Sequence, residues 1–155
     1  MISSEQPAII LLVEDSPDDV FFFRRAVHKS GLSAVTHVAV DGVEAMDYLL
    51  NTGRFADAAL YPPPDIMFLD LKLPHVNGFE LLDWIRRHAE CPQPPVVVLT
   101  SSSQPEDQQQ AEALGVSLYL IKPPAPEQLR QALHNCPWGR RKRGGMAFNQ
   151  NPNVL

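Results

Sequence analysis

Short apolar runs alternate with longer amphipathic segments along most of the chain. The first apolar run, Ala8-Ile9-Ile10-Leu11-Leu12-Val13, is hydrophobic at consecutive positions, which is typical of a parallel strand buried on both faces. The segments between such runs carry apolar residues at helical spacing, as Val20, Phe23 and Val27 do. This pattern predicts strands at residues 8–13, 35–40, 65–70, 96–100 and 116–121, and helices at about 17–29, 42–51, 79–88, 105–114 and 126–135.

Capping residues mark where the first of these helices begins and ends. Ser16 and Pro17 are typical of a helix start, with serine as the N-cap and proline in the first turn. Asp18 and Asp19 complement the positive end of the helix dipole, so we interpret both as solvated helix-start acids. Gly31 then indicates the end of the helix.

Two connecting segments carry strong turn or breaker signals. Three consecutive prolines at positions 62–64 are incompatible with regular structure, so we expect residues 52–64 to form an extended surface loop. Residues 71–78 contain Pro74 and the pair Asn77-Gly78, which predict a second loop directly after the third strand.

The order of the predicted elements indicates an α/β fold. Five strands alternating with five helices favour a doubly wound, flavodoxin-like parallel sheet with strand order 2-1-3-4-5 and helices on both faces. We expect residues 1–136 to form this one domain. Residues 137–155 are rich in Gly, Asn and Pro and contain the run Arg140-Arg141-Lys142-Arg143, which predicts a flexible, basic C-terminal tail.

Charge and composition narrow the class of protein. The formal net charge is -5, and because four of the 13 basic residues lie within 137–155, the rest of the chain carries nine basic against 18 acidic residues. This acidic body argues against nucleic acid as the main partner, and we interpret the basic run as a solubilising tail rather than a docking or nucleic-acid patch. The absence of a long apolar run, of a signal-peptide pattern and of paired cysteines predicts a cytoplasmic protein without a membrane segment.

Polar side chains follow four of the five predicted strands. Since the carboxyl ends of parallel strands share one edge of the sheet, we expect these groups to converge. Three clustered carboxylates would repel one another, and a hard divalent cation such as Mg²⁺ relieves that repulsion. We therefore expect Asp15 and Asp70 to ligate Mg²⁺ and Glu14 to hold a metal-bound water. The converging residues are Glu14, Asp15, Asp70, Thr100 and Lys122.

This arrangement suits phosphoryl transfer, which chiefly requires positioning and charge neutralisation. Asp70 follows the central strand and is the expected acceptor, whereas Asp15 belongs to an acidic pair better suited to holding the cation. The loop after Asp70 can turn the Lys72 carbonyl toward the metal. Lys122 can contact the transferred group, and Thr100 can donate a hydrogen bond to it.

Taken in order, these residues resemble the receiver domain of two-component response regulators. The resemblance covers about residues 8–135 and includes Glu14-Asp15, Asp70 with Leu71-Lys72-Leu73-Pro74 and Gly78, Val98-Leu99-Thr100, and Lys122-Pro123. It implies an acid pair at Glu14 and Asp15, a phosphoacceptor at Asp70 and a backbone metal ligand at Lys72. It further implies that Lys122 is the active-site lysine typical of receivers and that the Lys122–Pro123 bond is cis. It also implies that Thr100 and Tyr119 act as switch residues.

A narrower resemblance concerns the segment from Tyr48 to Asp65, which is similar to that of small receivers serving phytochrome-type histidine kinases. Two positions depart from the usual receiver pattern. Pro124 stands where an aromatic residue is more common, and Ser101 replaces the small residue that usually follows the switch hydroxyl. The extra hydroxyl could slow the access of water or of the phosphoryl donor to the site.

The resemblance implies a signalling switch rather than an enzyme acting on external substrates. The expected donor is a sensor histidine kinase or a phosphotransfer protein, and the expected output is a protein contact. That contact could include a homodimer through the face of helix 105–114, strand 116–121 and helix 126–135. The alternatives are a docking module of the same fold that takes no phosphate, a phosphohydrolase, and nucleic-acid binding through the tail. Lys72 argues against the phosphohydrolase, which would often carry an acid there.

Overall fold

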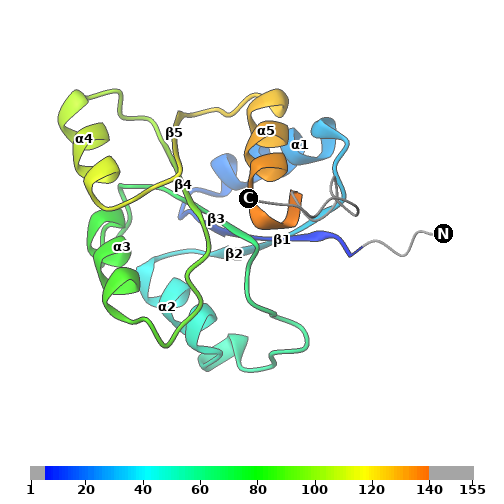
Figure 1. Ribbon diagram of the computed structural model, residues 1–155, viewed down its shortest axis with the longest axis vertical. Helices are drawn as coiled ribbons and strands as arrows, with labels where there is room; N and C mark the ends of the chain where they lie inside the picture. The colour runs from blue at the N-terminus through cyan, green and yellow to red at the C-terminus, as the bar shows by residue number, and fades with distance from the viewer. Residues whose placement is uncertain (1–5, 140–155) are drawn as a thin grey trace, which may run out of the picture.

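A five-stranded parallel sheet forms the centre of the molecule (Figure 1). The computed structural model describes residues 6–139. The strands lie in the order β2-β1-β3-β4-β5, which confirms the predicted order. Their bounds are β1 (Ala8–Val13), β2 (Ala34–Ala39), β3 (Ile66–Leu69), β4 (Val96–Thr100) and β5 (Leu118–Ile121).

Four α-helices connect successive strands, a fifth follows β5, and together they cover both faces of the sheet (Figure 1). Side chains alternate across the sheet along β3, because successive strand residues point to opposite faces. Phe68 packs with the core of α1 and α5, whereas Met67 and Leu69 pack with the core of α2 and α3. The helices are α1 (Pro17–Ser30), α2 (Gly42–Leu50), α3 (Gly78–Arg87), α4 (Pro105–Ala113) and α5 (Pro126–Asn135).

The start of α1 follows the predicted capping pattern. Ser16 is the N-cap, and its side chain accepts a hydrogen bond from the Asp19 backbone N–H at 3.3 Å. Gly31 ends the helix with a φ of 77°, a left-handed conformation that glycine adopts without steric cost. Because β1 ends at Val13, only a short connection separates the strand from the helix, so the first turn of α1 lies near the carboxyl edge of the sheet.

The segment after α2 differs from the predicted extended loop. Residues Gly53–Phe55 form a short 3-10 helix, η1, and Phe55 is buried in the core beside Tyr48. The Tyr48 hydroxyl donates a hydrogen bond to the Pro62 carbonyl at 2.9 Å, which fixes the proline run against the domain. The prediction that residues 52–64 contain no regular structure was therefore wrong for η1, although the prolines themselves lie outside helices and strands.

The packed part of the chain extends past the expected end of the domain at residue 136. Trp138 is buried in the core of α1 and α5, and its indole N–H donates a hydrogen bond to the Gln6 carbonyl at 3.0 Å. Burial of this large side chain outweighs the turn-forming character of its neighbours. The basic run Arg140-Arg141-Lys142-Arg143 lies outside the described residues. Within residues 6–139, no helix is both long and apolar enough to span a membrane.

Candidate functional site

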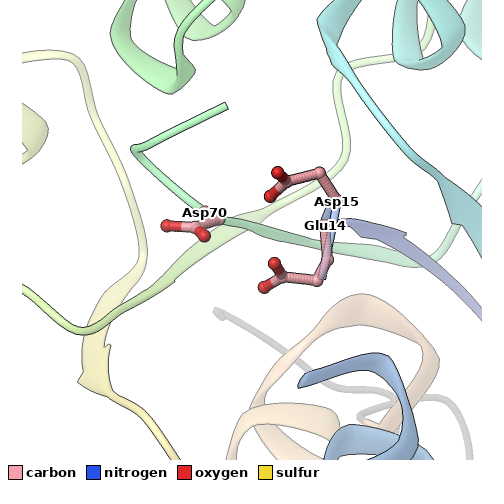
Figure 2. Close-up of side chains that lie close together, drawn as sticks. All are labelled: Glu14, Asp15 and Asp70. Carbon is pink, nitrogen blue, oxygen red and sulfur yellow. The ribbon is translucent and has the colours of Figure 1, made fainter. Parts of the chain in front are cut away.

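Three carboxylates gather at the carboxyl edge of the sheet, as the sequence predicts. Glu14 and Asp15 follow β1, and Asp70 follows β3 at the centre of the sheet. One carboxylate oxygen from each residue lies within 4.8 Å of the others (Figure 2). Glu14 and Asp70 are buried, whereas Asp15 is exposed. The cluster therefore has one side open to solvent.

Burial of Glu14 has an electrostatic cost. Desolvation raises the pKa of its carboxyl, and the hydrogen bonds from Lys122 and from the Ser16 backbone N–H lower the pKa only in part. The nearby Asp70 carboxylate raises the Glu14 pKa further. Like charges in a partly desolvated site favour the binding of a cation, because it stabilises all the charged forms at once.

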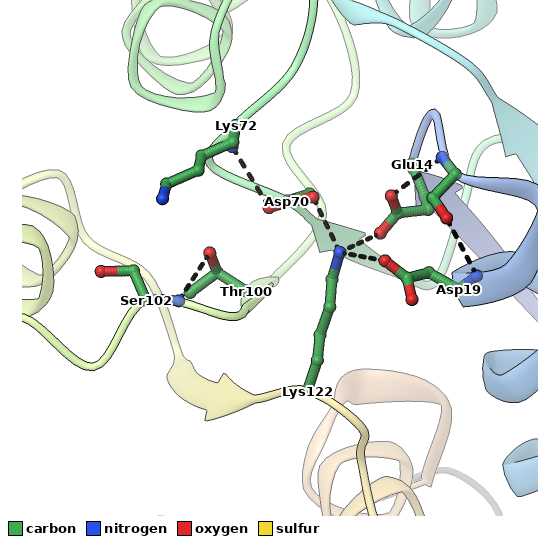
Figure 3. Close-up of polar contacts among 8 residues, drawn as sticks. Glu14, Asp19, Asp70, Lys72, Thr100, Ser102 and Lys122 are labelled. Atoms are coloured by element: carbon green, nitrogen blue, oxygen red, sulfur yellow. Dashed lines mark hydrogen bonds and ion pairs between the residues drawn. The ribbon is translucent and has the colours of Figure 1, made fainter.

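Lys122 supplies one positive charge to this edge from the end of β5. Its ammonium lies 2.6 Å from Glu14 Oε1, 2.8 Å from Asp70 Oδ2 and 2.8 Å from Asp19 Oδ2 (Figure 3). Burial lowers the pKa of Lys122, but the hydrogen bonds to these carboxylates outweigh burial, so the pKa is raised above its ordinary value. Lys122 is therefore an ammonium at neutral pH. The Lys122–Pro123 bond is cis, as the resemblance to receivers implies.

The loop after β3 holds the Asp70 side chain from the other side. The Lys72 backbone N–H donates a hydrogen bond to Asp70 Oδ1 at 3.2 Å. Gly78 closes this loop by donating its N–H to the Leu71 carbonyl at 2.9 Å. A Cβ at Gly78 would lie 2.5 Å from the Asp70 carbonyl oxygen, so only glycine permits this close backbone approach. That the Lys72 carbonyl is a metal ligand stays a prediction.

Thr100 and Tyr119 both contact Ser102, in the loop between β4 and α4. The Thr100 hydroxyl is buried and accepts a hydrogen bond from the Ser102 backbone N–H at 3.3 Å (Figure 3). The Tyr119 hydroxyl donates to the Ser102 carbonyl at 2.9 Å. The Ser102 hydroxyl in turn donates to Asp107 on α4 at 2.6 Å. One loop thus links the two predicted switch residues to the start of α4.

Two residues of this site were not expected from the sequence. Asp19 was interpreted as a solvated helix-start acid, yet its side chain contacts Lys122; the signal available was the closeness of the helix start to the end of β1. Ser102 lies in the loop after β4, and its contacts with β5 and α4 have no signature in a single sequence. His75, in the loop after β3, has an exposed side chain that lies 3.6 Å from Asp41, outside the carboxylate cluster.

The donor set of the cluster fits a hard divalent cation. All three ligand groups are carboxylate oxygens, which Mg²⁺ and Mn²⁺ prefer over the nitrogen and sulfur ligands that zinc favours. The open side at Asp15 leaves room for water, and Mg²⁺ usually retains several water ligands. Glu14, Asp15 and Asp70 would hold such a cation, which would neutralise charge and orient an incoming phosphoryl group.

Addition of Mg²⁺ is expected to stabilise the folded protein, since the carboxylate cluster exists only in the native state. At a concentration 100 times its Kd, the cation adds about 2.7 kcal/mol to the free energy of unfolding. Urea unfolding with Mg²⁺ and with EDTA measures this gain. We expect Asp15→Asn to lose most of it at the same Mg²⁺ concentration, and an equal gain in both proteins would show that the cation binds elsewhere.

Known proteins are similar to this chain in both sequence and fold. Residues 10–134 match the model of the response regulator receiver domain. A probable methanogenesis regulatory protein, FilR2 of Methanothrix harundinacea, is 34% identical over 152 residues, covering 98% of this chain and 92% of the relative. The response regulator Rcp1 of Synechocystis is 34% identical over 119 residues, covering 77% and 79% of the two chains.

Solved structures similar to this chain belong to response regulators as well. The bacteriophytochrome response regulator RtBRR superposes with a TM-score of 0.72 at 38% identity, over 83% of this chain and 76% of the other. The Mn²⁺-bound form of Rcp1 superposes with a TM-score of 0.67 at 29% identity, over 94% and 99% of the two chains. These relatives confirm the predicted resemblance to phytochrome-associated receivers. The chain belongs to the response-regulator receiver-domain family.

Proposed function

We propose that this chain is a phosphorylation switch that accepts a phosphoryl group on Asp70 with the help of Mg²⁺. The observation that carries the proposal is the convergence of Asp70 with two further carboxylates and the Lys122 ammonium at one edge of the sheet. The Mn²⁺-bound form of the relative Rcp1 supports a divalent cation in such a site.

The two oxygens of Asp70 have different partners, which orients the carboxylate. Oδ2 accepts from the Lys122 ammonium at 2.8 Å, and Oδ1 accepts from the Lys72 backbone N–H at 3.2 Å. In the proposed transfer, an Asp70 oxygen attacks phosphorus while the bond from phosphorus to the donor breaks. With a phosphohistidine donor, the electrons of that bond return to the imidazole nitrogen. Lys122 compensates the negative charge of the transferred group.

The proposed switch begins at Thr100 and Tyr119. Thr100 lies at the end of β4, and its hydroxyl is free to turn its proton toward a phosphoryl oxygen because it accepts rather than donates the bond with Ser102. A shift of this loop would break or remake the bond between Tyr119 and the Ser102 carbonyl. The change would alter the surface of α4, β5 and α5, where Leu118 and Ile121 are exposed. That surface is the proposed contact for a partner or a second copy.

The proposed donor is a sensor histidine kinase of the phytochrome type or a phosphotransfer protein. The similarity to a bacteriophytochrome response regulator supports this choice. The chemistry of the chain itself is then limited to acquiring and losing its own phosphoryl group, without turnover of an external substrate.

Acetyl phosphate tests the proposed function without a kinase. With Mg²⁺, the wild-type protein is expected to acquire one acid-stable, base-labile phosphoryl group, seen by intact mass, and with EDTA it is expected to acquire none. Beryllofluoride, a phosphoryl analogue, is expected to bind with the same Mg²⁺ requirement. Binding of neither reagent would overturn the proposal and favour a docking module that takes no phosphate, whereas multiple turnover of a small phosphate ester would favour a phosphohydrolase.

A further inference from the structure

Asp19 holds Lys122 from outside the carboxylate cluster. The ammonium of Lys122 donates to three carboxylates among the described residues, and two of them, Glu14 and Asp70, also belong to the cluster that suits a divalent cation. Asp19 Oδ2 lies 2.8 Å from the same ammonium but is not part of that cluster (Figure 3). The three contacts therefore differ in what happens to them when a cation binds.

Local structure fixes Asp19 in its position. Its backbone N–H donates to the Ser16 side chain, so the first turn of α1 is anchored to the chain that leaves β1. Its side chain is 38% exposed, so water can hydrate the carboxylate, and the ion pair with Lys122 is not needed to compensate for burial. Phe22, one turn further along α1, lines a shared depression with Pro123 and Pro124, beside Lys122. The first turns of α1 thus lie beside the segment that follows β5, and Asp19 contacts Lys122 there.

Competition for oxygen atoms distinguishes the partners of Lys122. A divalent cation at Glu14 and Asp70 would attract the carboxylate oxygens that the ammonium contacts, and its charge would repel the ammonium. The lysine side chain is long and flexible, so without a remaining partner it would lose its fixed place near Asp70. Asp19 is the partner that the cation leaves available.

We propose that Asp19 is a positioning residue that keeps the Lys122 ammonium beside Asp70 when a divalent cation engages Glu14 and Asp70. One N–H of Lys122 stays on Asp19, and the other two are released to contact the phosphoryl oxygens. This inference rests on the proposed function, since it concerns the same phosphoryl transfer. It adds a residue on α1 to the groups that determine the rate.

The neighbouring Asp18 provides a matched control. It is an exposed acid in the same helical turn, so its replacement by asparagine removes the same charge from the same helix end. At saturating Mg²⁺, Asp19→Asn is expected to slow labelling of Asp70 by acetyl phosphate about fivefold or more, while Asp18→Asn stays within about twofold of wild type. In a Lys122→Met background, Asp19→Asn is expected to cause no further slowing.

A second measurement needs no cation. Urea unfolding in EDTA compares Asp19→Asn in the wild type and in the Lys122→Met protein, and we expect the change in midpoint to be more unfavourable where Lys122 is present. Equal slowing by the two asparagine variants, an undiminished effect in Lys122→Met, or no coupling in EDTA would overturn the role of Asp19. Absence of labelling in the wild type would instead overturn the proposed function itself, and this inference with it.

Discussion

Replacement of Asp70 by asparagine is expected to abolish phosphoryl labelling while leaving the fold intact. The amide is close in shape to the carboxylate, but its nitrogen and oxygen do not form a stable acyl phosphate. Labelling by acetyl phosphate at saturating Mg²⁺, followed by intact mass, measures the effect. Circular dichroism of the same sample shows whether the variant is folded.

Asp15→Asn distinguishes the role of cation ligand from the role of phosphoryl acceptor. Asp15 lies in the same cluster but is exposed, and its expected role is to hold the cation. Its replacement is expected to weaken Mg²⁺ binding, so labelling falls at low Mg²⁺ and recovers as the concentration rises. Asp70→Asn is expected to show no recovery at any concentration. Labelling of Asp70→Asn to the wild-type extent would refute Asp70 as the acceptor.

Phe68→Ala is expected to give a large loss of stability. Phe68 is fully buried in β3, and its ring packs edge-on against the ring of Phe23 in α1 with a centroid separation of 4.9 Å. Truncation leaves a cavity between the sheet and α1, which costs about 3–5 kcal/mol of unfolding free energy. Urea unfolding monitored by circular dichroism measures this loss.

The matched control for Phe68→Ala is Phe21→Ala. Phe21 lies on α1 with 59% of its surface exposed, so its truncation is expected to change the unfolding free energy by no more than about 0.5 kcal/mol. A loss in Phe68→Ala similar to that in Phe21→Ala would contradict the described packing of β3 against α1. Because β3 carries Asp70 at its end, this packing also supports the site.

The sheet and the location of the site could be predicted because local sequence patterns determine them directly. Strands such as β1 and β4 are buried on both faces and read as continuous apolar runs. Once alternating strands and helices imply a parallel sheet, the residues after each strand must share one edge. Glu14, Asp15 and Asp70 are therefore near one another for topological reasons, and the structure places them so.

Features that depend on long-range contacts could not be predicted from the sequence. Phe55 is buried because Tyr48 and Tyr61 surround it, and neither contact is visible in the loop composition. Trp138 is packed against the core although its neighbours are typical of a tail. The same applies to Asp19, whose contact with Lys122 joins residues 103 positions apart. Propensity and periodicity describe single segments and carry no information on such pairs.

Chemical trapping of the acyl phosphate tests the central claim most directly. Borohydride reduces an aspartyl phosphate to homoserine, which peptide mass mapping locates after labelling with acetyl phosphate and Mg²⁺. We expect homoserine at position 70 and nowhere else. A labelled protein in which the reduced residue is Asp15 or another acid, or in which no acid is reduced, would contradict Asp70 as the phosphoryl acceptor.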